Sequence, residues 1–139
     1  MDFNFVMQNT RARDRMVFHL RVCQIDDGST VISAFISKAR RQVITAHVGD
    51  SRAVMITETD SFDLTADHKP SNPSEKERVE LEGGRIIQYG VLRVQGILAV
   101  TRALGDYCLR PYVSNIPTVN YFELKGKECF LILASDGLW

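Results

Sequence analysis

The order of apolar and polar residues along the chain predicts a protein built mainly from short strands. Its clearest element is the last one, where residues 130–134 form an uninterrupted apolar run, typical of a strand buried on both faces. Elsewhere, runs rich in β-branched and aromatic residues alternate with turn residues such as glycine and aspartate. These runs predict further strands at residues 31–37, 42–48, 51–57, 62–65, 85–88, 91–94, 97–100 and 118–124.

Two segments carry the spacing of helices instead. Residues 10–23 have apolar side chains at helical intervals, which predicts a surface helix. Ser74 and Glu77 match a capping box, which predicts a second helix that buries Val79 and ends at Gly83. Many short strands with few helices indicate an α+β fold, an antiparallel sheet or sandwich with helices packed on it.

Composition argues against several classes of function. The 139 residues contain 17 basic and 17 acidic side chains, so no net field favours nucleic acid or an anionic membrane. No apolar segment is long enough for a signal peptide or a membrane span. We expect a monomer that binds neither nucleic acid nor membranes.

The three cysteines, Cys23, Cys108 and Cys129, lie far apart and include no Cys-x-x-Cys pair. They therefore indicate neither a zinc site nor a disulfide framework. Cys23 and Cys129 have apolar neighbours, so we expect them to be small buried side chains. A reducing compartment is the default for such a chain, and the expected location is intracellular, cytoplasmic and/or nuclear.

Two aspartates beside predicted strands are candidates for chemistry. Asp136 follows the last strand directly, with Gly137 behind it to permit a sharp turn. A carboxylate held there suits a metal ligand or a catalytic group, although a simple Asp-Gly turn explains it as well. Gly49 and Asp50 join two predicted strands and are expected to form a tight hairpin, with Asp50 as a turn residue.

Two histidines are weaker candidates. His47 lies inside a predicted strand, where a single histidine is more often a packed or edge residue than a ligand. His68 follows Asp67, a pattern that could serve as an acid–base pair. Adjacent side chains rarely face one another, so a structural role in the loop is the better interpretation.

The strongest functional signal is a series of seven short motifs. They are Gly28-Ser29-Thr30; Gly49-Asp50-Ser51-Arg52-Ala53; Leu64-Thr65-Ala66-Asp67-His68-Lys69-Pro70; Glu77-Arg78 with Gly83-Gly84; residues 93–106; Val113 with Pro117 and Val119; and Leu133-Ala134-Ser135-Asp136-Gly137-Leu138-Trp139. In order and spacing they resemble the metal-dependent protein serine/threonine phosphatases of type 2C. The resemblance covers residues 28–139, taken as a partial catalytic domain, whereas residues 1–27 carry no matching motif.

This resemblance implies a sandwich of two antiparallel β-sheets flanked by helices, with an active site in a cleft at one edge. It implies dephosphorylation of phosphoserine and phosphothreonine in a phosphoprotein substrate, with Mg²⁺ or Mn²⁺ as cofactor. Hard cations select carboxylate oxygens rather than thiolates. Paired metals lower the pKa of a bridging water and clamp the phosphate oxygens for in-line attack.

By the same resemblance, Asp136 matches a family ligand of the metal centre, and Asp50 matches the position of a further, weaker metal beside it. We therefore expect folding to bring Asp50 and Asp136 together at a shared cation pocket. Three further residues in the motifs are expected to support the cleft: Arg52, Arg102 and Asp106.

The chain departs from the family pattern at both ends. No Asp-Gly-His-Gly-Gly stretch precedes Gly28, and the chain stops at Trp139, before the family's next aspartate and its later Asp-Asn metal pair. We expect a truncated domain that is inactive by itself and that exposes sheet edges and apolar surface. The alternative is a catalytically dead member that acts as a binding or regulatory module. Flanking sequence that encodes both missing motifs would favour the enzyme.

Overall fold

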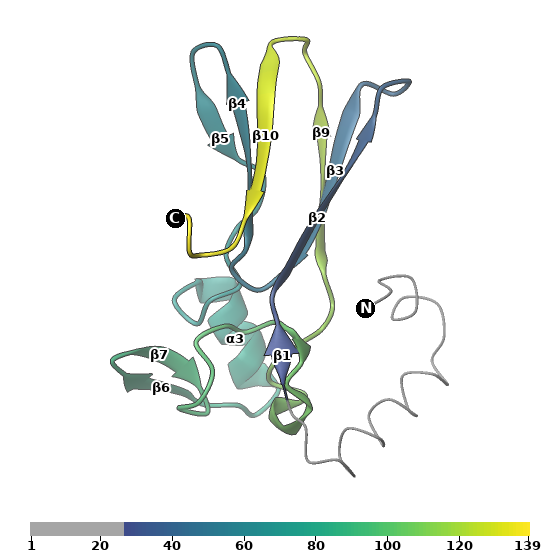
Figure 1. The fold of residues 1–139 in the computed structure, drawn as a ribbon. Coiled ribbons are helices and arrows are strands. Elements are labelled where there is room, and N and C mark those ends of the chain that lie inside the picture. The colour runs from purple at the N-terminus through teal and green to yellow at the C-terminus, as the bar shows by residue number, and fades with distance from the viewer. Residues whose placement is uncertain (1–26) are drawn as a thin grey trace.

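The computed structural model describes residues 27–139, so the predicted helix at 10–23 and Cys23 lie outside the described part. Two antiparallel three-stranded sheets dominate it and stand side by side in Figure 1. One sheet has the order β2 (Val31–Ser37), β3 (Gln42–Val48) and β9 (Thr118–Glu123). The other has the order β10 (Glu128–Ala134), β4 (Arg52–Thr57) and β5 (Ser61–Asp63).

The inner faces of these sheets share one apolar core, because alternate residues of each strand point to the same side. In β3 the buried positions are Val43, Thr45 and His47, two residues apart, followed by Val48. The core between the sheets consists of Val43, Ala53, Met55 and Leu64, with partly buried residues of β2, β9 and β10 packed against it. The predicted sandwich follows from this packing.

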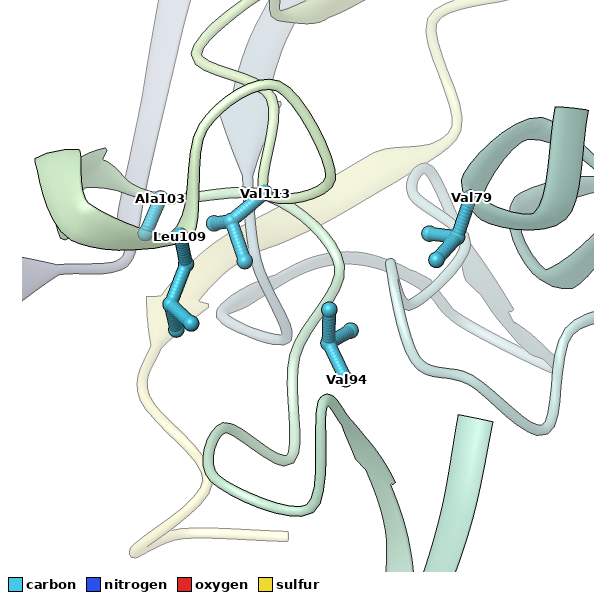
Figure 2. Packing of buried hydrophobic residues seen from close by; sticks show 5 residues of the cluster. All are labelled: Val79, Val94, Ala103, Leu109 and Val113. Atoms are coloured by element: carbon cyan, nitrogen blue, oxygen red, sulfur yellow. The ribbon is translucent and has the colours of Figure 1, made fainter. Parts of the chain in front are cut away.

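A second, smaller layer lies at one end of the two sheets (Figure 1). Its elements are α3 (Pro73–Leu81), the hairpin of β6 (Ile86–Tyr89) and β7 (Val91–Val94), the short pair of β1 (Gly28–Ser29) and β8 (Leu104–Gly105), and the 3₁₀ helix η1 (Tyr107–Leu109). This layer has its own buried cluster. In the view of Figure 2, Val94 lies between Val79 of α3 and a group formed by Ala103, Leu109 and Val113.

Helix α3 begins earlier than the capping box predicts. Asn72 is the N-cap, and its side-chain oxygen accepts a hydrogen bond from the Ser74 amide at 3.2 Å. Pro73 occupies the first helical position, where its fixed φ suits a helix and its missing N–H is not needed. The capping role predicted for Ser74 is therefore wrong, although Val79 is buried and Gly83, at φ +85°, follows the helix end as predicted.

The predicted hairpin at Gly49-Asp50 is also wrong. β3 pairs with β2 and β9, and β4 pairs with β10 and β5, so this segment carries the chain from one sheet to the other. Gly49 has a φ of +91°, which glycine adopts without strain. The loop is fixed from outside, because the His68 amide donates to the Gly49 carbonyl at 3.0 Å.

Three local predictions differ from the structure. Residues 97–100 form no strand, and only Leu98 bridges to Val94. β10 is not buried on both faces, because Phe130 is 67% exposed and Leu133 is 44% exposed, whereas Leu131 packs against the core. Cys129, expected to be buried, is exposed on the same strand. An apolar run is typical of a strand covered on both faces, and here only the face that carries Leu131 packs against the core between the sheets.

The crossing loop generates a stability prediction. A Cβ on Gly49 would lie 2.3 Å from Thr30 Cγ2, whereas one on Gly90, also at positive φ, would meet no atom within 4 Å. We expect Gly49→Ala to lower the free energy of unfolding by about 3 kcal/mol, from backbone strain and overpacking together. Gly90→Ala carries the strain alone, about 1 kcal/mol. Urea unfolding of both variants measures the difference, and equal losses would show that the loop is not closely packed.

Candidate metal site and its supporting polar network

The pairing of β4 with β10 brings Asp50 and Asp136 to the same end of one sheet. Arg52, the first residue of β4, pairs with Ala134, the last residue of β10. Asp50 lies two residues before Arg52, and Asp136 lies two residues after Ala134. Because the strands are antiparallel, both aspartates lie beyond the same end of the ladder, the end nearer to α3 in Figure 1. That they bind one cation together stays a prediction.

Asp50 lies in a small cluster of alternating charges. The Lys69 ammonium is 3.1 Å from Asp50 Oδ2 and 3.3 Å from Asp67 Oδ2. Arg52 binds Asp67 with two hydrogen bonds, from Nε at 2.8 Å and from Nη2 at 3.0 Å. These bonds from Arg52 lower the pKa of Asp67. Burial lowers the pKa of Lys69, but Asp50 and Asp67 outweigh it and raise that pKa overall.

Asp136 is exposed and occupies a turn directly after β10. The Leu138 amide donates to the Ser135 carbonyl at 3.1 Å, so Asp136 and Gly137 are the two central residues of that turn. The Trp139 indole donates back to the Ala134 carbonyl at 3.2 Å. The Asp-Gly turn that the sequence indicates is therefore present, and it leaves the Asp136 carboxylate open to solvent.

A buried carboxylate that the sequence reading missed organises the adjacent layer. Glu75 on α3 is 3% exposed. It accepts hydrogen bonds from Arg102 Nε at 3.0 and 3.1 Å, from Arg102 Nη2, and from Thr101 Oγ1 at 2.7 Å. Burial acts to raise the pKa of Glu75, but the bonds from Arg102 and Thr101 outweigh it and lower the pKa to about 2. One signal was available, since Glu75 is four residues before the buried Val79 and so shares its helix face.

His68 connects this carboxylate network to the Asp50 loop. Its Nδ1 accepts a hydrogen bond from the Gly49 amide at 3.1 Å, which leaves the ring proton on Nε2 to be donated to Thr118 Oγ1 at 2.8 Å. Thr118 Oγ1 also accepts from Arg102 Nη1 at 3.3 Å. Burial lowers the pKa of His68 to about 4, and the charge of Arg102 acts in the same direction.

The two histidines therefore have structural contacts, as expected. His47 is 1% exposed, and its Nε2 is 2.8 Å from the Ala66 carbonyl oxygen. Its ring stacks on that of His68 with 4.3 Å between centroids and 7° between planes. Asp67, the neighbour of His68 in sequence, binds Arg52 and Lys69 as described above.

The three residues expected to support the cleft have different places. Arg52 holds Asp67, and Arg102 holds Glu75. Asp106 precedes η1 in a left-handed conformation with φ +47°. Its carboxylate fills the space beside Gly28, because a Cβ there would lie 1.8 Å from Asp106 Oδ2. Each of the three thus contributes to packing or pairing around the end of the sandwich.

The donor chemistry fits part of a magnesium or manganese site. Asp50 and Asp136 offer hard carboxylate oxygens, which such cations prefer. Among residues 27–139, no three His, Cys, Asp or Glu side chains are grouped so that they could hold a metal ion. The two aspartates therefore fit a partial ligand set.

A cavity of ≈ 320 Å³ lies far from these aspartates, between the opposite ends of the two sheets. Its lining includes Phe62 of β5, Glu123 at the end of β9 and Glu128 at the start of β10. Glu128 pairs with Thr57, the residue of β4 farthest from Asp50. This cavity is thus separate from the candidate metal site.

The buried carboxylate generates a prediction about stability. Glu75→Gln would leave the largely buried Arg102 guanidinium without its charge partner, so we expect the free energy of unfolding to fall by about 3 kcal/mol. Glu77→Gln, on the same helix but exposed, should change it by less than about 0.5 kcal/mol. Urea unfolding at neutral pH provides the measurement. A loss for Glu75→Gln no larger than that of its control would contradict the importance of the pair.

The depressed pKa of His68 generates a pH dependence. The unfolded chain takes up a proton at this residue below pH 6.5, but the folded chain does so only below about 4. Stability therefore falls as the pH falls through this window, by about 2 kcal/mol between about pH 7 and pH 5. Glu75, whose pKa is lowered from 4.5 to about 2, contributes only at lower pH. Urea midpoints at both pH values should differ less for His68→Asn than for the original chain; identical differences would contradict this role.

Comparison with known proteins identifies one family. The family model described as Protein phosphatase 2C matches residues 4–139. The chain is 46% identical over 112 residues to probable protein phosphatase 2C 8 of Oryza sativa subsp. japonica, covering 81% of this chain and 27% of that protein. It is 43% identical over 112 residues to protein phosphatase 2C 3 of Arabidopsis thaliana, covering 81% and 25%.

Two solved structures share the fold. A Caenorhabditis elegans sex-determining protein superimposes with a TM-score of 0.85 and 32% identity, over 92% of this chain and 32% of that one. A serine-threonine phosphatase 2C from Toxoplasma gondii gives 0.76 and 30%, over 93% and 48%. The expected fold class, an α+β sandwich of the type 2C kind, is confirmed.

Two further facts concern the length of the chain relative to its relatives and the character of its helices. It spans about a quarter of the length of the curated relatives that it matches. Among residues 27–139, no helix has both the length and the apolar character needed to cross a membrane. The family match over nearly the whole sequence, the identity to curated relatives and the shared sandwich lead to one conclusion: the chain belongs to the protein phosphatase 2C family, whose members are metal-dependent.

Proposed function

We propose that residues 28–139 form part of the catalytic domain of a protein serine/threonine phosphatase, which removes phosphate from phosphoserine and phosphothreonine in proteins. The observation that carries this proposal is the antiparallel pairing of β4 with β10, because it sets the backbones of Asp50 and Asp136 at one end of the sheet. Membership of the protein phosphatase 2C family supports the reaction class.

In this proposal, Asp136 and Asp50 would hold Mg²⁺ or Mn²⁺. When bound, such cations lower the pKa of a bound water and neutralise charge on the phosphate oxygens. Asp136 suits this task because it is exposed at the end of a paired strand, where its backbone is fixed. Asp50 is held more tightly and is only 9% exposed.

The charged neighbours of Asp50 would orient it. Lys69 lies between the carboxylates of Asp50 and Asp67, and Arg52 fixes Asp67 from the other side. This arrangement keeps two carboxylates near one another without net repulsion, since two cationic side chains balance them. A further cation at Asp50 then needs a second carboxylate, the role proposed here for Asp136.

We also propose the substrate class, the oligomeric state and the cellular location that the sequence predicts. The substrate would be a phosphoprotein, and the protein would act as a monomer in a reducing, intracellular compartment, cytoplasmic and/or nuclear. The three widely spaced cysteines, which indicate no disulfide framework, support a reducing compartment.

A chimera tests the proposed reaction. Residues 28–139 would replace the matching segment of a type 2C phosphatase of measured activity, which supplies the Asp-Gly-His and Asp-Asn motifs that this chain lacks. We expect the chimera to release phosphate from a phosphothreonine peptide in the presence of Mn²⁺. Asp136→Ala in the chimera should lower the rate on the order of 100-fold, because a lost metal ligand removes several kcal/mol of transition-state stabilisation.

Two controls accompany this experiment. Glu58→Ala, at an exposed carboxylate beyond the end of β4 that is farthest from Asp50, should leave the chimera's rate unchanged. The 139-residue chain alone, with the same peptide and Mn²⁺, should release no more phosphate than its own Asp136→Ala variant. A folded chimera without activity would favour the alternative, a catalytically dead module that binds or regulates.

A further inference from the structure

We infer that His68 is the positioning residue of the proposed metal site: its ring holds the Gly49 amide and thereby fixes the direction in which Asp50 leaves the loop. The inference rests on the proposed function, since it assigns His68 a task at that site. It concerns a residue that is not itself expected to touch the metal or the substrate.

The Asp50 loop needs an anchor from outside. It carries the chain between two sheets, so no hairpin hydrogen bonds hold it. Gly49 has no side chain and a φ of +91°. Glycine can adopt several other backbone conformations with little strain, so the residue alone does not fix this one. Side chains also contact the loop, through the Thr30 Oγ1–Ser51 Oγ hydrogen bond at 2.8 Å and the Lys69–Asp50 ion pair at 3.1 Å, but neither contact binds the peptide groups of Gly49.

His68 supplies that anchor through two contacts with one residue. Its backbone amide donates to the Gly49 carbonyl at 3.0 Å, and its Nδ1 accepts from the Gly49 amide at 3.1 Å. Gly49 is thus held at both of its polar backbone groups. The carbonyl of His68 in turn accepts from the Thr101 amide at 2.8 Å, which ties the pair to the segment that carries Arg102.

Two further contacts fix the ring of His68. Its Nε2 donates to Thr118 Oγ1 at 2.8 Å, and one face stacks on His47 at 4.3 Å between centroids. Thr118 is held by Arg102, whose guanidinium binds Glu75. A continuous chain of hydrogen bonds therefore runs from α3 to the Gly49 amide.

This arrangement assigns a direction to each bond. Because a backbone N–H can only donate, Nδ1 must be the acceptor, and the neutral ring carries its proton on Nε2. A side chain that accepts at the Nδ1 position should therefore preserve the Asp50 loop. One that reproduces only the Nε2 bond to Thr118 should not.

Two amide variants separate these roles. Asn at position 68 can place an oxygen near the site of Nδ1, while Gln places its amide near the site of Nε2. Mn²⁺ alone serves as the probe, and its binding to the 139-residue chain is followed by the electron paramagnetic resonance signal of the free ion. We expect His68→Gln to weaken Mn²⁺ binding at least about 10-fold, and His68→Asn to stay within about 3-fold of the original chain, as for outer-shell partners of metal ligands.

A general loss of packing would affect the two variants equally. Both variants remove the imidazole that stacks on His47, so both should lower the urea midpoint by similar amounts. Equal Mn²⁺ affinities for the two variants, or a larger loss for His68→Asn, would overturn the inference. Glu58→Ala, at an exposed carboxylate just beyond the end of β4 that is farthest from Asp50, controls for nonspecific binding.

Hydrogen exchange of the Gly49 amide provides a readout that does not need the metal. We expect exchange at least about 10-fold faster in His68→Gln than in His68→Asn, relative to the loss of global stability in each. If the original chain binds no Mn²⁺, Asp50 and Asp136 do not hold the ion without the motifs that this chain lacks, and the exchange rates alone test the anchor. Equal exchange rates at Gly49 would then overturn it.

Discussion

The structure depends on a buried ion pair between Glu75 and Arg102. A carboxylate that is 3% exposed is tolerated only when charge and hydrogen bonds replace its lost water, and Arg102 with Thr101 provides both. The pair joins α3 to the segment that leads into β9. Through Thr118 and His68 it also reaches the loop between the two sheets. One ion pair thus connects the smaller layer to the sandwich.

This connection brings together motifs that lie far apart in the sequence. The Asp50 loop, the Asp67-His68 segment and Arg102 come from three separate parts of the chain, yet hydrogen bonds link each to the next, the last of them through Thr118. The β4–β10 pairing then adds the end of the sequence to the same region. A site assembled in this way depends on the fold as a whole, so its geometry is sensitive to substitutions that lie well outside it.

Local signals predicted most strands and the position of α3, because alternation and turn residues act over a few positions. Partner choice could not be predicted in the same way. Gly49-Asp50 has the composition of a hairpin turn, but β3 and β4 pair with other strands, in two different sheets. The N-cap is Asn72 rather than the predicted Ser74, because Pro73 suits the first helical position. Its helical spacing from Val79 indicates that Glu75 lies on the buried face of α3, but no local pattern reveals its partner Arg102, 27 residues away.

The candidate metal residues also show the limit of local sequence patterns. The resemblance selected Asp50 and Asp136, and the strand register sets both at one end of a sheet. Local reasoning alone classified each as a turn residue, and the structure shows that Asp136 does lie in a turn. The two interpretations do not compete, because a turn at the end of a paired strand is what holds a carboxylate in a fixed place. Whether such an aspartate can serve a metal depends on the side chains around it, and the β4–β10 register brings the Asp50 backbone to the same end of the sheet as Asp136.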